Sequence, residues 1–235
     1  DQVCNILKGK NKNIVYCPER IVQGKSIEEL PKLPQIIAGY NQSSIIATKN
    51  LFKKITSKII VTSVLEAELI KLFSNANRYI NFSIANEFYM ICKENNLDFS
   101  RVRKIMRDGY ERNLNLPIAG FAAGPCLLKD TMQLSSFYKN KFSLGHTAMH
   151  INENIPKFLV DDLRKKYNLK KKIIGVLGLT FKAETDDIRD SLSIKLLQYL
   201  KKLKLKTLQS DEYYKNKNNV NKENLVKNSD IIIIA

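Results

Sequence analysis

A single cysteine at position 126 stands in a segment whose composition is unlike that of a protein core. The segment is GFAAGPCLLKD, so Cys126 follows Gly124 and Pro125 and comes shortly before Lys129 and Asp130. Buried structural cysteines normally belong to periodic apolar runs, whereas this one lies among small and turn-forming residues. The pattern has two interpretations: an ordinary turn that contains a cysteine, or a thiol nucleophile presented between a cation and a carboxylate.

Two other short stretches contain residues that suit acid–base chemistry. Lys71 and Asn75 are four residues apart and would share one face of a helix, with Glu68 within one turn of the lysine. Taken alone, Lys71 is more typical of a surface lysine paired with an acid. Glu19 directly follows Pro18 at the end of a strand-like run. It is either a turn acid or a general base held in a strand-end loop.

The stretch GVLGLTFKAETDDIR has features of a ligand-binding loop. Gly175 and Gly178 form G-x-x-G, which is shorter than the G-x-G-x-x-G dinucleotide fingerprint, so we expect Gly178 to serve close packing of a strand against a helix. Charged side chains then gather at the carboxyl end of the expected strand, where open α/β sheets bind ligands: Lys182, Asp186, Asp187 and Arg189. The alternative is a solvated helix start, with aspartates near the positive end of the helix dipole.

Helical periodicity dominates the middle of the chain. From about residue 64 to 95, apolar residues recur at three- and four-residue steps without proline, which predicts one helix roughly 45 Å long. The stretch DFSRVRKIMRDG predicts a shorter helix with Ser100 as its N-cap, and a further helical pattern covers about 131–167. A helix as long as the first is typical of a domain spine or a dimer interface.

Strand patterns lie at both sides of this helical region. Residues 11–44 contain two strand-like runs, which indicate the edge of an α/β sheet. After residue 172, a β run over 173–177, an amphipathic helix and a second β run ending at Asp211 predict a βαβ unit and therefore a parallel sheet. The terminal run SDIIIIA is typical of a buried strand of that sheet. Because the chain opens without Met and stops on this strand, we expect it to be the middle of a longer polypeptide.

Composition excludes few function classes. The chain has 235 residues, of which 44% are hydrophobic, and no apolar run long enough to span a membrane. Its four cysteines have no metal-ligand spacing, which favours reduced thiols, no metal and a cytoplasmic location: Cys4, Cys17, Cys92 and Cys126. The net charge of +16 is spread among acids and amides, so it is weak evidence for nucleic acid or an anionic membrane.

Taken in order, four motifs resemble the UDP-glucose/GDP-mannose dehydrogenase family, the nucleotide-sugar 6-dehydrogenases. They are C-P-E-R, A-E-L-x-K-L-x-x-N-A, G-x-x-x-G-P-C-L-x-K-D-T and G-x-L-G-L-x-F-K-x-x-T-D-D-I-R-x-S, and they cover nearly the whole chain. The resemblance implies an α/β fold in three parts: the end of an NAD-binding Rossmann domain (1–60), a helical central domain that dimerises through its long helix (61–166), and the start of a UDP-sugar-binding Rossmann-like domain (167–235).

The resemblance also implies a reaction. A primary alcohol of a UDP-sugar is oxidised twice with NAD, and a cysteine captures the intermediate aldehyde as a thiohemiacetal that becomes a thioester. Because the glycine fingerprint for NAD would lie before residue 1, this polypeptide alone is not expected to catalyse the reaction. The implied partners are the UDP-sugar and a second copy of the chain, with neither nucleic acid nor a membrane.

Site roles follow from the resemblance, motif by motif. Cys126 would be the nucleophile, Lys71 would stabilise the developing alkoxide, and Asn75 and Asp130 would hold and activate the water or alcohol, with Glu19 as the base for thioester hydrolysis. Arg112 corresponds to a substrate-binding arginine that reaches into the neighbouring subunit's site. The other implied contacts are substrate binding by Phe121, Gly124, Lys129 and Lys182, and cofactor binding by Arg189.

Departures from the family pattern concern the sugar. Many UDP-glucose enzymes read Gly-Phe-Gly-Gly-Ser-Cys before the nucleophile, where this chain reads Gly-Phe-Ala-Ala-Gly-Pro-Cys, and Gln23 stands where some carry a second carboxylate. The CPER motif is more similar to the branch that oxidises UDP-N-acetylhexosamines, and UDP-glucose is the alternative substrate.

Two alternatives belong to other function classes. A basic helical nucleic-acid-binding module predicts a cationic stripe with interleaved aromatics, but Lys71 and Arg78 stand among mostly uncharged residues of the long helix. A non-catalytic scaffold relative of the family has no need for the thiol of Cys126.

Overall fold

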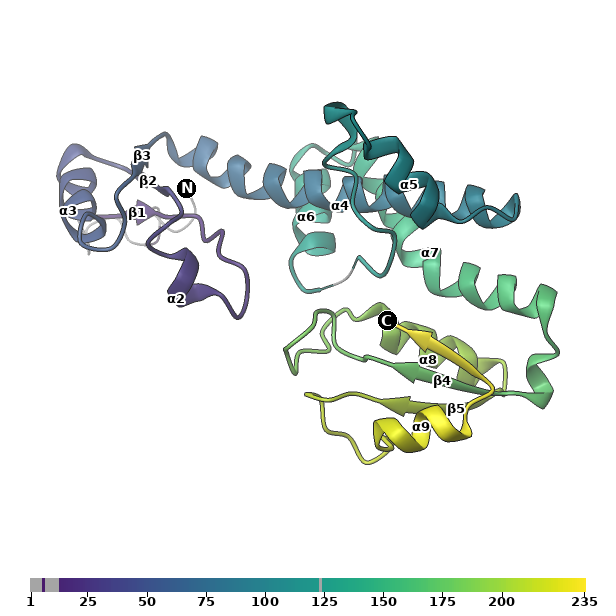
Figure 1. The fold of residues 1–235 in the computed structure, drawn as a ribbon. Coiled ribbons are helices and arrows are strands. Elements are labelled where there is room, and N and C mark those ends of the chain that lie inside the picture. The colour runs from purple at the N-terminus through teal and green to yellow at the C-terminus, as the bar shows by residue number, and fades with distance from the viewer. Residues whose placement is uncertain (1–5, 7–12, 123) are drawn as a thin grey trace. The chain divides into compact units, whose positions relative to one another are not determined.

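The computed structural model describes residues 6, 13–122 and 124–235 and divides the chain into two compact units, 1–74 and 75–235. The fold is α/β, with a long central helix and a parallel sheet, as the sequence predicts (Figure 1). Cys4 lies outside the described residues. The three cysteines that the structure does describe are free thiols: Cys17, Cys92 and Cys126.

The first unit is built on a small mixed sheet. Its elements in chain order are β1 (Val15–Tyr16), α2 (Ser26–Glu29), β2 (Gln35–Gly39), α3 (Gln42–Phe52) and β3 (Ile59–Val61). β2 is central, antiparallel to β1 and parallel to β3, so the two strand-like runs expected in 11–44 are confirmed. Ile36 and Ala38 on one face of β2 are buried together with Ala67.

The long helix predicted over 64–95 is confirmed as α4 (Val64–Glu94). A capping box begins it: Glu66 accepts hydrogen bonds from the amide and hydroxyl of Ser63, and the Ser63 hydroxyl lies 3.3 Å from the Glu66 amide. A hydrogen bond from the Thr62 hydroxyl and those from Ser63 lower the pKa of Glu66 from its usual 4.5 to about 2. Near the other end, Lys93 lies over the ring of Tyr89.

The shorter predicted helix is confirmed as α5 (Phe99–Arg107), but its expected N-cap is wrong. Asp98 has the extended backbone of a cap, and its carboxylate accepts a hydrogen bond from the Ser100 amide at 2.9 Å. Aspartate and serine are both good caps, and the chain leaves the helical conformation at the first of them. Ser100 therefore lies inside the first turn.

The remaining helical pattern divides into two helices. They are α6 (Leu127–Phe137) and α7 (Ser143–Lys166), with short 3₁₀ turns before and after them, η1 (Glu111–Asn113) and η2 (Leu169–Lys171). Ser135 of α6 and His146 of α7 join the helices through a 2.7 Å hydrogen bond between the hydroxyl and Nε2. Among the helices that the structure describes, none is long and apolar enough to cross a membrane.

The second sheet has the strand order β5-β4-β6 and is parallel throughout. Its elements are β4 (Ile173–Leu177), α8 (Leu192–Lys202), β5 (Lys206–Ser210), α9 (Lys222–Asn228) and β6 (Ile231–Ile234). The βαβ unit is therefore confirmed. The expectation of a buried last strand is wrong: β6 lies at the edge of the described sheet, and its residues alternate, so that Ile231 and Ile233 pack on the core while Ile234 is 80% exposed.

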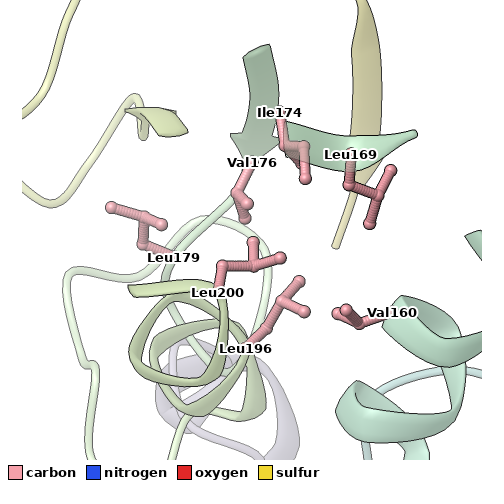
Figure 2. Packing of buried hydrophobic residues seen from close by; sticks show 7 residues of the cluster. All are labelled: Val160, Leu169, Ile174, Val176, Leu179, Leu196 and Leu200. Carbon is pink, nitrogen blue, oxygen red and sulfur yellow. The ribbon is translucent and has the colours of Figure 1, made fainter. Parts of the chain in front are cut away.

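The core of this sheet lies between β4 and helices α7 and α8. Figure 2 shows Ile174 and Val176 of β4 directed toward Leu196 and Leu200 of α8, with Val160 of α7 beside them. All five side chains are fully buried.

In the G-x-x-G motif, the packing role that was expected for Gly178 belongs to Gly175. A Cβ atom on Gly175 would meet Leu225 of α9 and Ser229, which directly follows this helix, so this glycine provides the close packing of strand against helix. Gly178 instead has a φ of +94°, and a Cβ there would lie 2.5 Å from the backbone oxygen of Ala235. The prediction for Gly178 was therefore wrong, because the crowding comes from a neighbouring strand end and from the left-handed turn.

Candidate active site

Cys126 lies at the start of α6, where its side chain is exposed and makes no capping hydrogen bond. Its backbone carbonyl accepts the first helical hydrogen bond, from the amide of Asp130 at 2.8 Å. The thiol and the carboxylate therefore lie at positions i and i+4, one helical turn apart on the same side of the helix. The loop before Cys126 reaches this position through Gly124, which has a φ of +107°.

A buried amide network anchors the beginning of this loop. The amide of Gly120 donates to Asn86 Oδ1 at 2.8 Å, and Asn86 Nδ2 donates to Asn152 Oδ1 at 2.8 Å. Asn152 Nδ2 then donates to the carbonyl of Tyr79 at 3.0 Å. Both asparagines are fully buried, so the network fixes the loop to α4 and α7 with its polar groups satisfied.

The end of the loop is fixed by a close contact with the sheet. A Cβ atom on Gly124 would lie 2.6 Å from Cδ2 of Phe181, in the loop after β4. The backbone of Gly124 therefore packs directly on the Phe181 ring. This contact joins the candidate nucleophile to the second sheet.

Asn75 and Asp130 meet in a buried pair. Asn75 Nδ2 donates to Asp130 Oδ2 at 2.6 Å, and the side chains come from α4 and α6. Asp130 is 4% exposed, and its other oxygen lies 3.3 Å from Nζ of Lys129, whose side chain is exposed. The carboxylate is thus oriented by a fixed donor and a mobile cation, and it stands one turn from Cys126.

The loop after β4 is ordered by its own hydrogen bonds. Ser191 Oγ donates to the carbonyl of Leu179 at 2.6 Å, and the Phe181 amide donates to the carbonyl of Asp187 at 3.1 Å. Arg189 forms a bidentate pair with Asp187, with nitrogen–oxygen distances of 3.0 and 2.7 Å. That hydrogen bonding and the charge of Asp187 raise the pKa of Arg189, and Cys126 adds a smaller contribution of the same sign.

A cavity of about 1070 Å³ opens at the carboxyl ends of the second sheet. It borders Leu177 of β4, Ser210 of β5 and Ile234 of β6, and it reaches Phe121 in the loop that precedes Cys126. Three lysines bring positive charge to its wall: Lys182, Lys215 and Lys222. Four acidic residues also line it: Glu184, Asp211, Glu212 and Glu223. With asparagine side chains and Tyr213, the wall therefore offers charged groups of both signs and polar edges to a ligand.

Three other candidate residues make contacts of their own: Lys71, Glu19 and Arg112. In the first unit, Nζ of Lys71 is 3.9 Å from a carboxylate oxygen of Glu19, and Lys71 precedes Asn75 by one turn of α4. Arg112 of η1 is exposed and stacks over the ring of Tyr110, to whose hydroxyl it also donates. No group of three or more His, Cys, Asp or Glu side chains within the described ranges could hold a metal ion.

Sequence reasoning did not identify two parts of this region. Asn86 and Asn152 give no signal, because an asparagine within a helix is usually a solvated one. Lys215, Lys222 and Asp211 could have been found, since they follow β5 at the edge where open α/β sheets bind ligands.

Comparison with known proteins places the chain in a family. Residues 65–154 match the central domain of the UDP-glucose/GDP-mannose dehydrogenase family, and residues 175–235 match its UDP-binding domain. The chain belongs to this family of nucleotide-sugar dehydrogenases. The resemblance inferred from the four motifs is therefore confirmed.

Relatives of this family member match all or most of its length. UDP-N-acetyl-D-mannosamine dehydrogenase from Pyrococcus horikoshii is 28% identical over 100% of the chain, which spans 57% of that protein. A relative with the same name from Methanocaldococcus jannaschii is 30% identical over 82% of the chain and 45% of that protein. Among solved structures, the P. horikoshii enzyme superposes with a TM-score of 0.87 at 27% identity, covering 100% of this chain and 58% of the other. UDP-N-acetyl-mannosamine dehydrogenase from Staphylococcus aureus gives 0.86 at 26% identity, covering 100% and 57%.

Proposed function

We propose that this chain forms the central and UDP-sugar-binding parts of an enzyme that oxidises the 6-hydroxyl of a UDP-N-acetylhexosamine to the carboxylate. The observation that carries the proposal is the joining of two sites by the Gly124–Phe181 contact. A cavity in the UDP-binding domain, with lysines on its wall, lies on one side, and an exposed thiol beside a buried carboxylate lies on the other. The names of the relatives and the CPER motif favour the N-acetylhexosamine over UDP-glucose.

The cavity would receive the nucleotide. A diphosphate needs cations, and Lys182, Lys215 and Lys222 stand on the cavity wall. The ring of Tyr213, 48% exposed, offers a stacking surface for a pyrimidine. The sugar would then extend toward Phe121 and the loop that carries Cys126, with Lys129 at the first turn of α6.

The thiol would do covalent chemistry on the oxidised sugar. The sulfur of Cys126 adds to the aldehyde carbon, and the carbonyl oxygen takes up a proton to give a thiohemiacetal. Once this adduct has been oxidised to the thioester, water adds to the carbonyl carbon and the carbon–sulfur bond breaks, which returns the thiol and yields the acid. Asp130, held by Asn75, is placed to orient and deprotonate that water. Lys71 would stabilise the oxyanion, and Glu19, its ion-pair partner, is the second candidate base.

NAD is the hydride acceptor that the family implies, and the chain does not by itself fit a dinucleotide. The printed sequence contains no G-x-G, and the loop after β4 is the shorter G-x-x-G. We therefore assign no hydride-transfer step to the residues described. The proposed contribution of this chain to cofactor binding is limited to Arg189.

The proposal includes a homodimer. The helix α4 exposes large apolar side chains on part of its surface, among them Phe88 and Ile91. A second copy of the chain would cover them, and Arg112 would reach from one subunit into the site of the other. Sedimentation of the intact protein at micromolar concentration should give a dimer, whereas a strict monomer would contradict this part.

The test is Cys126→Ser in the intact protein, supplied with UDP-N-acetylmannosamine and NAD. Serine is close in size, so UDP affinity should stay within about twofold, because the exposed thiol makes no packing contact that serine cannot keep. Steady-state NADH formation should fall at least ~10³-fold, as expected when a covalent catalyst is removed. Cys92→Ala, in a buried cysteine of α4 far along the helix, is the control and should keep its rate. Two NADH per sugar at a near wild-type rate in Cys126→Ser would refute the nucleophile.

A further inference from the structure

The carboxylate of Asp211 binds two loops of the cavity at once. Oδ2 accepts hydrogen bonds from the amides of Leu179 at 2.6 Å and Thr180 at 3.2 Å, in the loop after β4. Oδ1 accepts from the amides of Tyr213 at 2.9 Å and Tyr214 at 2.7 Å, in the loop after β5. The first two bonds link residues more than thirty positions apart. A single side chain therefore ties together the carboxyl ends of neighbouring strands.

These four bonds leave the carboxylate little capacity for another donor. An ionised carboxylate offers about four lone-pair positions, and four backbone amides occupy them. Burial raises the pKa of Asp211, but the four backbone hydrogen bonds outweigh burial and hold the pKa below its ordinary value. The residue is thus a saturated anion at neutral pH. In dinucleotide-binding Rossmann domains, an acid after the second strand accepts hydrogen bonds from a ribose instead.

The loop that Asp211 holds also carries the contact to the candidate nucleophile. Leu179 and Thr180 lead directly into Phe181, whose ring packs on Gly124. The backbone of residue 124 leads in turn to Cys126, two residues later. The position of Phe181 depends on the loop that precedes it, and that loop has Asp211 as its partner across the sheet edge.

We propose that Asp211 is a positioning residue that couples the nucleotide cavity to the Cys126 loop, and that it does not recognise the ribose. The coupling runs through backbone amides of Leu179 and Thr180 to Phe181 and Gly124. The part about the ribose rests on the proposed function, since it needs a nucleotide in the cavity. The part about the loops does not.

Two variants and one control separate the possibilities. Asp211→Asn keeps one acceptor oxygen and replaces the other by a donor, so it breaks the bonds to one of the two loops. Asp211→Ser retains a local acceptor for the Tyr213 amide but cannot reach Leu179, so it cuts only the link across the sheet edge. Glu212→Gln removes the same charge from the neighbouring residue, which is exposed and lines the same cavity.

The first measurement is made on the free protein by NMR. In Asp211→Ser we expect hydrogen exchange of the Leu179 and Thr180 amides to accelerate roughly tenfold, the factor that one net hydrogen bond is worth. The nuclear Overhauser contact between the Phe181 ring and the Gly124 α-protons should also weaken or vanish. Glu212→Gln should match wild type in both. Unchanged exchange and an unchanged Phe181–Gly124 contact in both Asp211 variants would overturn the coupling.

The second measurement is calorimetric binding of UDP and of 2′,3′-dideoxy-UDP. We expect each Asp211 variant to weaken both nucleotides by the same factor, about tenfold, because a displaced loop affects them equally. A loss confined to UDP would overturn the inference, since it would mean that Asp211 contacts ribose hydroxyls. Failure of the wild-type protein to bind UDP would refute the proposed function, while the exchange measurement would still decide the role of Asp211 in the loops.

Discussion

Replacing Asn75 by alanine should destabilise residues 75–235, and the size of the effect follows from the burial of its partner. Asp130 is 4% exposed, and the amide of Asn75 is its hydrogen-bond donor at 2.6 Å. In Asn75→Ala the carboxylate keeps only the ammonium of Lys129, whose 65% exposed side chain provides a weak, solvent-screened interaction. Hydrogen bonds to charged groups contribute about 1.5–3 kcal/mol, so the free energy of unfolding should fall by about 2 kcal/mol.

The assay is urea unfolding of a double-mutant cycle formed by Asn75→Ala, Asp130→Ala and the double variant. The coupling energy should be about 2 kcal/mol, because both changes remove the same bond. Asn81→Ala is the matched control on α4, since the side-chain hydrogen bonds of Asn81 go to Asn77 in the same helix. It corrects for the higher helix propensity of alanine, which is worth roughly 0.5 kcal/mol. A coupling energy below about 0.5 kcal/mol would refute the reasoning that this bond compensates the buried charge.

Three further changes test the local arguments. Gly124→Ala should cost about 1–3 kcal/mol, because alanine is strained at a φ of +107° and its methyl group would meet the Phe181 ring; thermal unfolding that matches wild type would show that the loop can shift freely. Since hydrogen bonds lower the pKa of Glu66 from 4.5 to about 2, its contribution to stability should be complete above pH 4.5 and lost as the pH falls toward 2. Subtracting the acid unfolding profile of Glu66→Gln from that of wild type measures this difference, and coincident profiles would contradict it. Asp98→Ala should cost about 1 kcal/mol in urea unfolding, while Ser100→Ala, inside the first turn, should cost clearly less, and the reverse order would restore Ser100 as the cap.

Local patterns predicted most of the secondary structure, because periodicity is a property of consecutive residues. The spacing of apolar residues was enough for α4, and alternation of strand and helix was enough for the parallel sheet. The sequence did not predict the cap of α5 correctly, because Asp98 and Ser100 are both capping residues and only backbone dihedral angles distinguish them. The prediction for Gly178 failed for a related reason, since the atom that crowds it is the backbone oxygen of Ala235, a residue far away in the sequence.

In the candidate site, too, features set by neighbouring residues were predictable and features set by distant residues were not. Cys126 was noticed because small and turn-forming residues precede it and Asp130 follows it closely, and the bond from Asn75 to Asp130 joins residues that motif resemblance had already grouped. The place of Asp211 after β5 is visible in the sequence, but its role in holding two loops is not. Its partners are backbone amides, which every residue but proline carries, so no choice of side chain in the loop after β4 announces them.

The packing of Gly124 on Phe181 also bears on how the molecule folds. The two residues belong to segments far apart in the chain, and contacts between distant segments form late because the intervening chain must first be ordered. The helices can be native-like while the loop before Cys126 is still unrestrained, and it takes its final shape only when the second sheet docks. The contact between Gly124 and the Phe181 ring should therefore form late on refolding, after helical circular dichroism has returned.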